Sequence, residues 1–367
     1  MLRQPVPGPH DEWQHLSYAA AVQAGAGLRP RFEAQYQLDE SDLGRVTGAL
    51  NYIGHPAPYY AYVALFLDRT LPAGHAVLLP RLASLALFAA AIGLVLVAGR
   101  RWFGDDPLAW LCFCGLVVLC PKQLLTAQQV TNDALAALGG GLAYWGAARL
   151  GRAPAGAAAI GLGLLLALWA KLNAGLVIGL WAGCLLLYLR SWRLFASLAV
   201  AGLAGALPYA DILARYGRLV PVTWESVTGF THRPLPLAEG LGLFLGQYPL
   251  GWSVEETPGP LLMVAFLALL GAMLGGAWLG WRRREEPAGL VALGAGIAFV
   301  LGTLVQLGFT LTVLGGSRGG AAFRYVLPLW PMLAHAVALL ARQPARPWLP
   351  AGLLALVLFA SIGGLLR

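Results

Sequence analysis

The stretch LPRLASLALFAAAIGLVLVAGRRWFG, residues 79–104, decides the class of this protein. Its apolar run is long enough to cross the roughly 30 Å hydrocarbon core of a bilayer, and it ends on two arginines. Over the whole chain, hydrophobic residues make up 58% and charged residues 11%, whereas a typical soluble domain has about 25% charged residues. The mean hydropathy is +0.67. The sequence therefore predicts an all-α protein that crosses the membrane many times.

Similar apolar stretches recur along the chain, and we expect about ten transmembrane helices. Their ranges are 77–99, 107–125, 130–148, 154–170, 172–189, 194–212, 260–281, 287–313, 323–341 and 348–366. The expected organisation is an outward segment (1–76), helices one to six (77–212), an outward loop (213–259) and helices seven to ten (260–367).

Arginines in alternate loops predict the orientation of these helices. The loops are RRWFGDD (100–106), RLGR (149–152), RSWR (190–193), WRRREEP (281–287) and ARQPARP (341–347), with eleven arginines and four acidic residues in all. The positive-inside rule places them in the cytoplasm. Segments 1–76, 213–259 and 314–322 then face outward. The net charge of +8 is mostly this orientation signal, so we do not expect a nucleic-acid partner.

The outward segment 1–76 contains no apolar stretch of spanning length. We expect two interfacial helices there, one over 11–26 and one beginning near Tyr59. On the first helix, the i, i+4, i+7 spacing places Asp11, His15 and Tyr18 on one face and the apolar residues, led by Trp13, on another. Either the first spanning helix inserts with its N-terminus outward, or a helix upstream of residue 1 is missing, which we favour.

Polar and charged residues whose positions the positive-inside rule does not explain are the candidate functional residues, because ionisable side chains near lipid are energetically costly. The candidate catalytic residues are the carboxylates Asp11, Glu12 and Asp133. The candidate substrate-binding residues are His15, His55, Lys122, Lys171, Asn173, His232, Arg233, Arg324 and Tyr325. A carboxylate can take a proton from an acceptor hydroxyl, and cations can hold a phosphate.

Structural roles are the alternative for each of these groups. Acids in the first turn of a helix complement its dipole, and Asp133 also fits the start of a capped helix. Cations at helix ends can be snorkelling anchors, and 213–259 can be a solvated connector.

A metal site receives little support from the residue spacing. In HDEWQH (10–15) the histidines are five apart and do not share a helix face, and the Glu12–His15 pair has no second copy. The sequence leaves open whether a divalent cation assists the carboxylates. The four cysteines lie in or at the ends of predicted helices and form no disulfide framework: Cys112, Cys114, Cys120 and Cys184.

The order of several motifs resembles that in GT-C glycosyltransferases, which include protein O-mannosyltransferases and the bacterial aminoarabinose transferase. The motifs are PHDEWQHLSYA (9–19), HPAPYYAYVAL (55–65), the quoted 79–104 stretch, TNDALAALGGGLAYW (131–145), AKLNAGLVI (170–178) and FRYVLPLWP (323–331). The resemblance covers nearly the whole chain and is strongest over 9–175. The chain departs from the family in lacking a helix before the acidic motif and in His10, which interrupts the usual Pro-Asp-Glu.

The resemblance implies a GT-C-like bundle that uses a polyprenyl-phosphate-linked sugar and inverts the anomeric centre. By position, Asp11 matches the family's general base, Glu12 its neighbour and Asp133 a second outward acid. His55 and Lys171 fall where relatives present polar or basic groups near the donor phosphate, and Arg324 is a weaker match. Acceptor recognition would lie in 213–259.

The resulting hypothesis is a bacterial inner-membrane glycosyltransferase that works on the periplasmic face. Its partners would be membrane lipid, the donor, and an acceptor glycan, lipid or protein. A polytopic transporter or lipid flippase is the alternative, although it predicts mid-membrane ionisable groups and inverted repeats. A truncated family member with a scaffold role is a third. The sugar, acceptor, carrier length and oligomeric state do not follow from the sequence.

Overall fold

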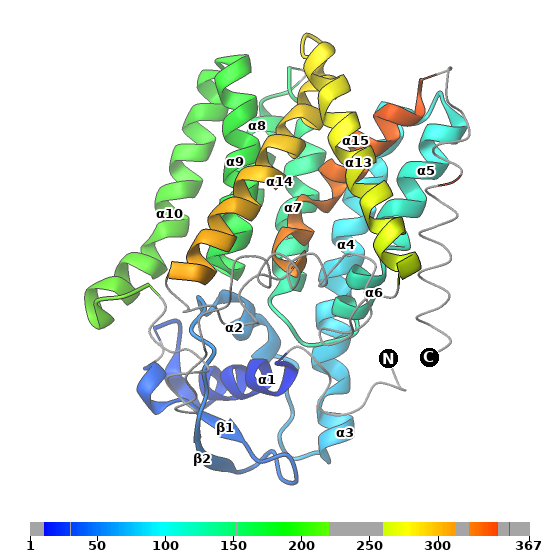
Figure 1. The fold of residues 1–367 in the computed structure, drawn as a ribbon. Coiled ribbons are helices and arrows are strands. Elements are labelled where there is room, and N and C mark those ends of the chain that lie inside the picture. Colours follow the sequence, from blue (N-terminus) through cyan, green and yellow to red (C-terminus); the bar gives the residue numbers. More distant parts are fainter. Residues whose placement is uncertain are drawn as a thin grey trace.

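The computed structural model describes residues 11–29, 31–151, 153–219, 260–312, 323–343 and 352. Long helices form a bundle, and a smaller N-terminal module (11–29 and 31–76) lies at one end of it (Figure 1). The bundle comprises α4 (Leu78–Phe103), α5 (Pro107–Val118), α6 (Pro121–Ala127), α7 (Asp133–Ala147), α8 (Pro154–Ala170), α9 (Leu172–Leu189), α10 (Trp192–Tyr216), α13 (Pro260–Arg282), α14 (Pro287–Thr312), the 3-10 helix η3 (Phe323–Leu329) and α15 (Trp330–Ala341).

The first nine predicted spans each coincide with a helix or a pair of helices within the described ranges. Four of these helices are long and apolar enough to cross a membrane alone, and α5 with α6, bent by 43°, would be a fifth. Shorter apolar helices cover 154–170, 266–282 and 325–341. The helical membrane fold is confirmed, whereas the number of about ten spans is not, and 348–366 lies outside the described residues except for 352.

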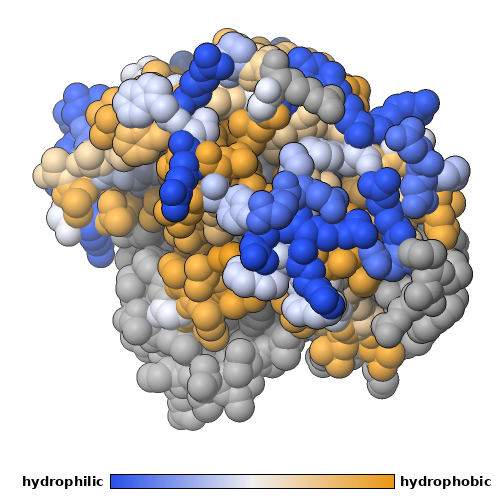
Figure 2. All heavy atoms as spheres, turned by 90° about the horizontal axis from the view of Figure 1, so that it is seen from above, coloured by the Kyte–Doolittle hydropathy of each residue, from blue (hydrophilic) through white to orange (hydrophobic). Residues whose placement is uncertain are grey.

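The arginine-rich loops meet at one end of the bundle. Figure 1 shows the connections after α4, α7, α9 and α13 at the end opposite the N-terminal module. Two contacts agree with this arrangement: Tyr188 donates a hydrogen bond to Glu285 at 2.7 Å, and Arg342 lies 4.0 Å from Asp106. Figure 2, which looks onto this end, shows hydrophilic residues gathered over an otherwise hydrophobic surface. The arginine-rich loops thus lie on one side of the bundle, as the positive-inside rule predicts.

Glycines allow α7 and α8 to approach closely. A Cβ on Gly139 would lie 2.6 Å from the carbonyl oxygen of Gly163, and one on Gly146 would lie 2.6 Å from that of Gly156. Small residues at such crossings are typical of membrane helices, in which backbone proximity provides van der Waals packing. The glycine run therefore determines how closely α7, which begins at Asp133, packs against α8.

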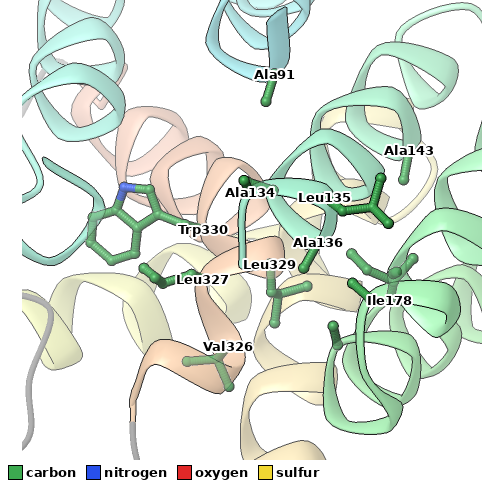
Figure 3. Close-up of a cluster of buried hydrophobic side chains, with 14 of the residues drawn as sticks. Ala91, Ala134, Leu135, Ala136, Ala143, Ile178, Val326, Leu327, Leu329 and Trp330 are labelled. Atoms are coloured by element: carbon green, nitrogen blue, oxygen red, sulfur yellow. The ribbon is translucent and has the colours of Figure 1, made fainter. Parts of the chain in front are cut away.

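The centre of the bundle contains a large cluster of buried apolar side chains. Figure 3 shows side chains from α4, α7, α9, η3 and α15 meeting in one cluster, with Trp330 and Ile178 at its edges. Trp330 is 1% exposed, and its indole nitrogen donates to the carbonyl oxygen of Leu116 at 2.9 Å. The indole thus satisfies its polar group while filling the gap between α15 and α5. No disulfide joins the four cysteines, all of which lie in the described ranges.

We expect Gly140→Ala to destabilise the protein. A Cβ at this position would lie 2.0 Å from the carbonyl oxygen of Pro328 in η3, so η3 must move, at a cost of about 1–3 kcal/mol. Thermal unfolding in detergent measures the loss. The matched control is Gly183→Ala on α9, where nothing lies within 4 Å of the added carbon. Equal unfolding temperatures for the two variants would contradict the close approach of α7 and η3.

The N-terminal module combines short helices with a β-hairpin that the sequence did not predict. Its elements are α1 (Glu12–Ala21), the π-helix η1 (Val22–Ala26), the 3-10 helix η2 (Phe32–Ala34), β1 (Tyr36–Leu38), β2 (Val46–Leu50), α2 (Pro58–Ala64) and α3 (Ala73–Ala76). The two strands pair antiparallel. The helices expected over 11–26 and from Tyr59 are present. The resulting module is a small α/β layer capping one end of the bundle (Figure 1).

The apolar face of α1 does not contact lipid, contrary to our expectation of an interfacial helix face. Trp13, Leu16 and Ala20 are at most 4% exposed. Trp13 donates from its indole nitrogen to the carbonyl oxygen of Leu38 at 2.8 Å, so β1 covers this face. The module buries α1 between the hairpin and α2 (Figure 1), so its apolar pattern reflects protein packing.

Candidate active site

Asp11 begins the N-terminal module in an unusual backbone conformation. Its φ of 63° lies in the left-handed region, which aspartate tolerates better than most residues. The phenol of Tyr52 donates to Asp11 Oδ1 at 2.5 Å, and the backbone carbonyl of Asp11 accepts from the His15 amide at 3.0 Å. Asp11 is half-buried. The turn and the phenol therefore hold a partly accessible carboxylate at the start of α1.

Glu12, the adjacent acid, is fully buried. Arg81 of α4 binds it through two bonds, Nε to Oε1 at 2.8 Å and Nη2 to Oε2 at 2.5 Å. The backbone amide of Val130 also donates to Oε1 at 2.9 Å. Glu12 thus joins α1 to α4 and to the segment before α7, a geometry that suits positioning of the module.

Arg81 was not among the residues that the sequence predicted for the site, nor does it lie in any of the arginine-rich loops. The available signal was its place: Arg81 lies at the end of α4 that faces the module, where the positive-inside rule predicts no arginine. Its side chain is 5% exposed, and burying a guanidinium requires a paired partner. Such a misplaced arginine in an apolar span is a marker of a buried ion pair.

His15 lies on the buried side of α1 and not at an open surface. Its Nδ1 is 2.9 Å from the Tyr60 hydroxyl, and Tyr60 stacks on Tyr18 with 3.8 Å between ring centroids. Tyr18 donates to the carbonyl oxygen of His55 at 2.8 Å. Burial raises the pKa of Tyr18 and of Tyr60 above the usual value for a phenol, so both hydroxyls stay protonated. This aromatic cluster ties α1 to α2 and fixes the backbone at His55.

Asp133 and Lys171 form a buried ion pair within the bundle. Their side chains are 3% and 4% exposed, and the Thr131 hydroxyl donates to Asp133 Oδ2 at 3.2 Å. Lys171 is an extended residue, φ −168° and ψ 151°, between α8 and α9. Its Nζ lies 5.0 Å from the centroid of the Tyr325 ring. A break between two helices therefore directs one cation toward the start of α7.

The remaining predicted residues have different placements. Lys122 is buried on α6, and Asn173 is half-buried in the first turn of α9. His232 and Arg233 lie outside the described residues, and for Arg324 only the backbone, in η3, is described. The catalytic and binding roles assigned to all these residues stay predictions.

A short segment connects the two halves of the site. Val130 binds Glu12 of the module, and Asp133, three residues later, binds Lys171 of the bundle. Asn132 between them donates to the carbonyl oxygen of Ala170 at 2.7 Å. Segment 130–133 thus brings the acidic start of α1 and the lysine of the helix break to the same end of the bundle. The arrangement offers a carboxylate for proton transfer and a cation for an anionic group.

The described ranges contain no cluster of side chains that could bind a divalent cation. Within them, no group of three or more histidine, cysteine, aspartate or glutamate side chains is arranged to hold a metal ion.

Comparison with known proteins identifies the fold. No protein-family model matches the chain, and no curated protein matches it. Its structure is similar to the crystal structure of ArnT from Cupriavidus metallidurans in the apo state, with a TM-score of 0.54 over 93% of this chain and 17% sequence identity. The chain has an ArnT-like fold. It spans 56% of the length of the ArnT chain. The helical membrane bundle expected from the motif order is confirmed with an ArnT-like fold, and at this identity the similarity concerns the fold alone.

Proposed function

We propose that this protein is a membrane glycosyltransferase of the GT-C type. It would transfer a sugar from a polyprenyl-phosphate carrier to an acceptor hydroxyl, with inversion at the anomeric carbon. The observation that carries the proposal is the ArnT-like fold, which spans 93% of the chain, with Asp11 half-buried where the module meets the bundle. ArnT is an aminoarabinose transferase of the GT-C family.

In the proposed reaction, Asp11 is the general base. It takes the proton of the acceptor hydroxyl as the acceptor oxygen attacks the anomeric carbon on the face opposite the phosphate. The new carbon–oxygen bond forms while the bond between the anomeric carbon and the phosphate oxygen breaks, and polyprenyl phosphate leaves. The bond from Tyr52 to Asp11 Oδ1, 2.5 Å long, supports this role because it orients the carboxylate.

The donor phosphate would be held near Lys171, with His55 and Arg324 as further predicted partners. The side chain of Lys171 lies at the break between α8 and α9 and is paired with Asp133. The phosphate would join this pair, so that the ammonium group stabilises the negative charge that develops as the carrier leaves. The Glu12–Arg81 pair would act by positioning α1.

The polyprenyl chain requires an apolar surface between helices. A small recess of about 10 Å³ between α4, α5, α7 and η3 is lined by Phe88, Ala91, Val95, Val117, Ala137 and Leu327, among others. It is too small for an isoprenoid unit, so these helices would have to separate to admit the tail, with which their apolar side chains would make dispersion contacts. The arginine-rich loops at the opposite end of the bundle support a position in the bacterial inner membrane with the module on the periplasmic side.

Ligand-induced stabilisation tests the proposal. Purified protein in lipid nanodiscs, with and without a divalent cation, is titrated with short-chain polyprenyl-phosphate sugars and with the corresponding free polyprenols. A ligand at 100 times its Kd stabilises the folded state by about 2.7 kcal/mol, so the melting temperature should rise with the phosphate-linked sugars. No shift with any lipid-linked sugar would contradict the proposal and favour the transporter alternative.

A further inference from the structure

Gln306 on α14 is a buried polar residue. Its side chain is 3% exposed, and within the described part of the chain neither Oε1 nor Nε2 has a hydrogen-bond partner. Leaving a buried amide unsatisfied is costly, so each such group requires an explanation. A ligand that binds beside Gln306 would supply the missing hydrogen bonds.

The packing of α9 and α14 determines which way Gln306 points. A Cβ on Gly302 would lie 2.7 Å from Val177, and one on Gly294 would lie 3.1 Å from Trp181. Residue numbers increase along α14 in the direction in which they decrease along α9, so the two helices run antiparallel. Gly302 therefore marks the face of α14 that contacts α9.

This register places Asn173 within about one helical turn of Gln306 along the pair of helices. Gln306 is four residues after Gly302 and lies on the same face of α14, while Asn173 is four residues before Val177 and lies on the same face of α9. Each is one helical turn, about 5.4 Å, beyond the Gly302–Val177 contact and in the same direction. The two carboxamides therefore face the same gap between the helices, with Gln306 buried in it and Asn173 half-buried.

The gap adjoins the cation of the candidate site. Lys171 precedes Asn173 by two residues, at the break between α8 and α9. Tyr325 of η3 lies beside Lys171, with 5.0 Å between Nζ and the ring centroid, and η3 packs against both α9 and α14. A phosphate at Lys171 would thus have two neutral amides within about one helical turn of it.

We propose that Asn173 and Gln306 bind hydroxyl groups of the sugar carried by the lipid donor. The inference rests on the proposed function, in which the phosphate of that donor meets Lys171. A carboxamide both donates and accepts hydrogen bonds, as a sugar hydroxyl does, and the sugar is bonded directly to the phosphate. The two amides then determine which sugar is accepted, while Lys171 recognises the carrier.

The test compares the affinity of two ligands, a short-chain polyprenyl-phosphate sugar and the same polyprenyl phosphate without the sugar. Gln306→Leu and Asn173→Leu should each weaken binding of the sugar-bearing donor by about tenfold, from the loss of one or two hydrogen bonds. Binding of polyprenyl phosphate should be unchanged. The control is Gln343→Leu at the opposite end of the bundle, whose Nε2 is also buried without a partner among the described residues.

The outcomes separate this inference from the proposed function. Equal weakening of both ligands, or no weakening of either, would overturn the inference and leave the glycosyltransferase proposal standing. Failure of the wild-type protein to bind either ligand would overturn both. Gln306→Leu removes a buried unsatisfied amide and should fold; if it does not, Asn173→Leu, at a half-exposed position, gives the same comparison.

Discussion

Asp11→Asn is expected to lower the turnover of a polyprenyl-phosphate sugar by about 10²–10⁴-fold, the contribution typical of a general base. Asparagine has nearly the same shape as aspartate and also tolerates the left-handed conformation, φ 63°, found here. Its amide oxygen can still accept the hydrogen bond from Tyr52, whose hydroxyl lies 2.5 Å from Asp11 Oδ1. The variant should therefore fold and bind the donor, and lose only the ability to accept a proton.

Steady-state kinetics of donor consumption measure this effect. The loss should fall on kcat, with little change in KM, because the proton moves only in the transition state. Asp39→Asn, in the exposed hairpin, is the control and should retain full turnover; the Asp39 carboxylate accepts local hydrogen bonds from the backbone amide and the hydroxyl of Ser41, the latter at 2.6 Å. Equal turnover in wild-type protein and Asp11→Asn would contradict Asp11 as the base and direct attention to Glu12 or Asp133.

Arg81→Met is expected to destabilise the protein by about 3–5 kcal/mol. The exchange leaves the Glu12 carboxylate, 0% exposed, without its opposite charge, and breaking a buried pair costs about this much. The contact between α1 and α4 then weakens, and Asp11 at the start of α1 loses its fixed position. Chemical or thermal unfolding in detergent gives the difference in stability.

Two further variants make the Arg81→Met result interpretable. Glu12→Gln combined with Arg81→Met removes both charges and should be more stable than Arg81→Met alone. Arg45→Met breaks the exposed Arg45–Asp42 pair, 3.2 Å apart with side chains 80% and 50% exposed, and should change stability by less than about 1 kcal/mol. If Arg81→Met unfolded like Arg45→Met, the buried pair would not secure the module.

The helices of the bundle could be predicted from the sequence because a backbone that crosses lipid has few alternatives to an α-helix. A backbone in hydrocarbon must satisfy its own hydrogen bonds, so an apolar run of sufficient length becomes a helix. The ranges 154–170 and 172–189 match α8 and α9 to the residue, since Lys171 marks the break. The hairpin β1–β2 gave no such signal: its strands have three and five residues, and most of β2 is exposed.

The pairing of polar residues could not be predicted, because it depends on how helices pack. Asp133 and Lys171 are 38 residues apart and meet only because α7, α8 and α9 return to the same end of the bundle. Glu12 and Arg81 are 69 residues apart, and nothing local to either indicates the other. The apolar face of α1 was assigned to lipid for the same reason: the pattern shows that a face is buried without showing what covers it.

The most direct test of the account is the release of polyprenyl phosphate from a short-chain polyprenyl-phosphate sugar by the purified protein in nanodiscs. The account predicts release by the wild-type protein, through transfer to an added acceptor or to water, and at least a hundredfold less by Asp11→Asn. No release from any donor across a panel of sugars and acceptors, by protein that remains folded, would contradict it.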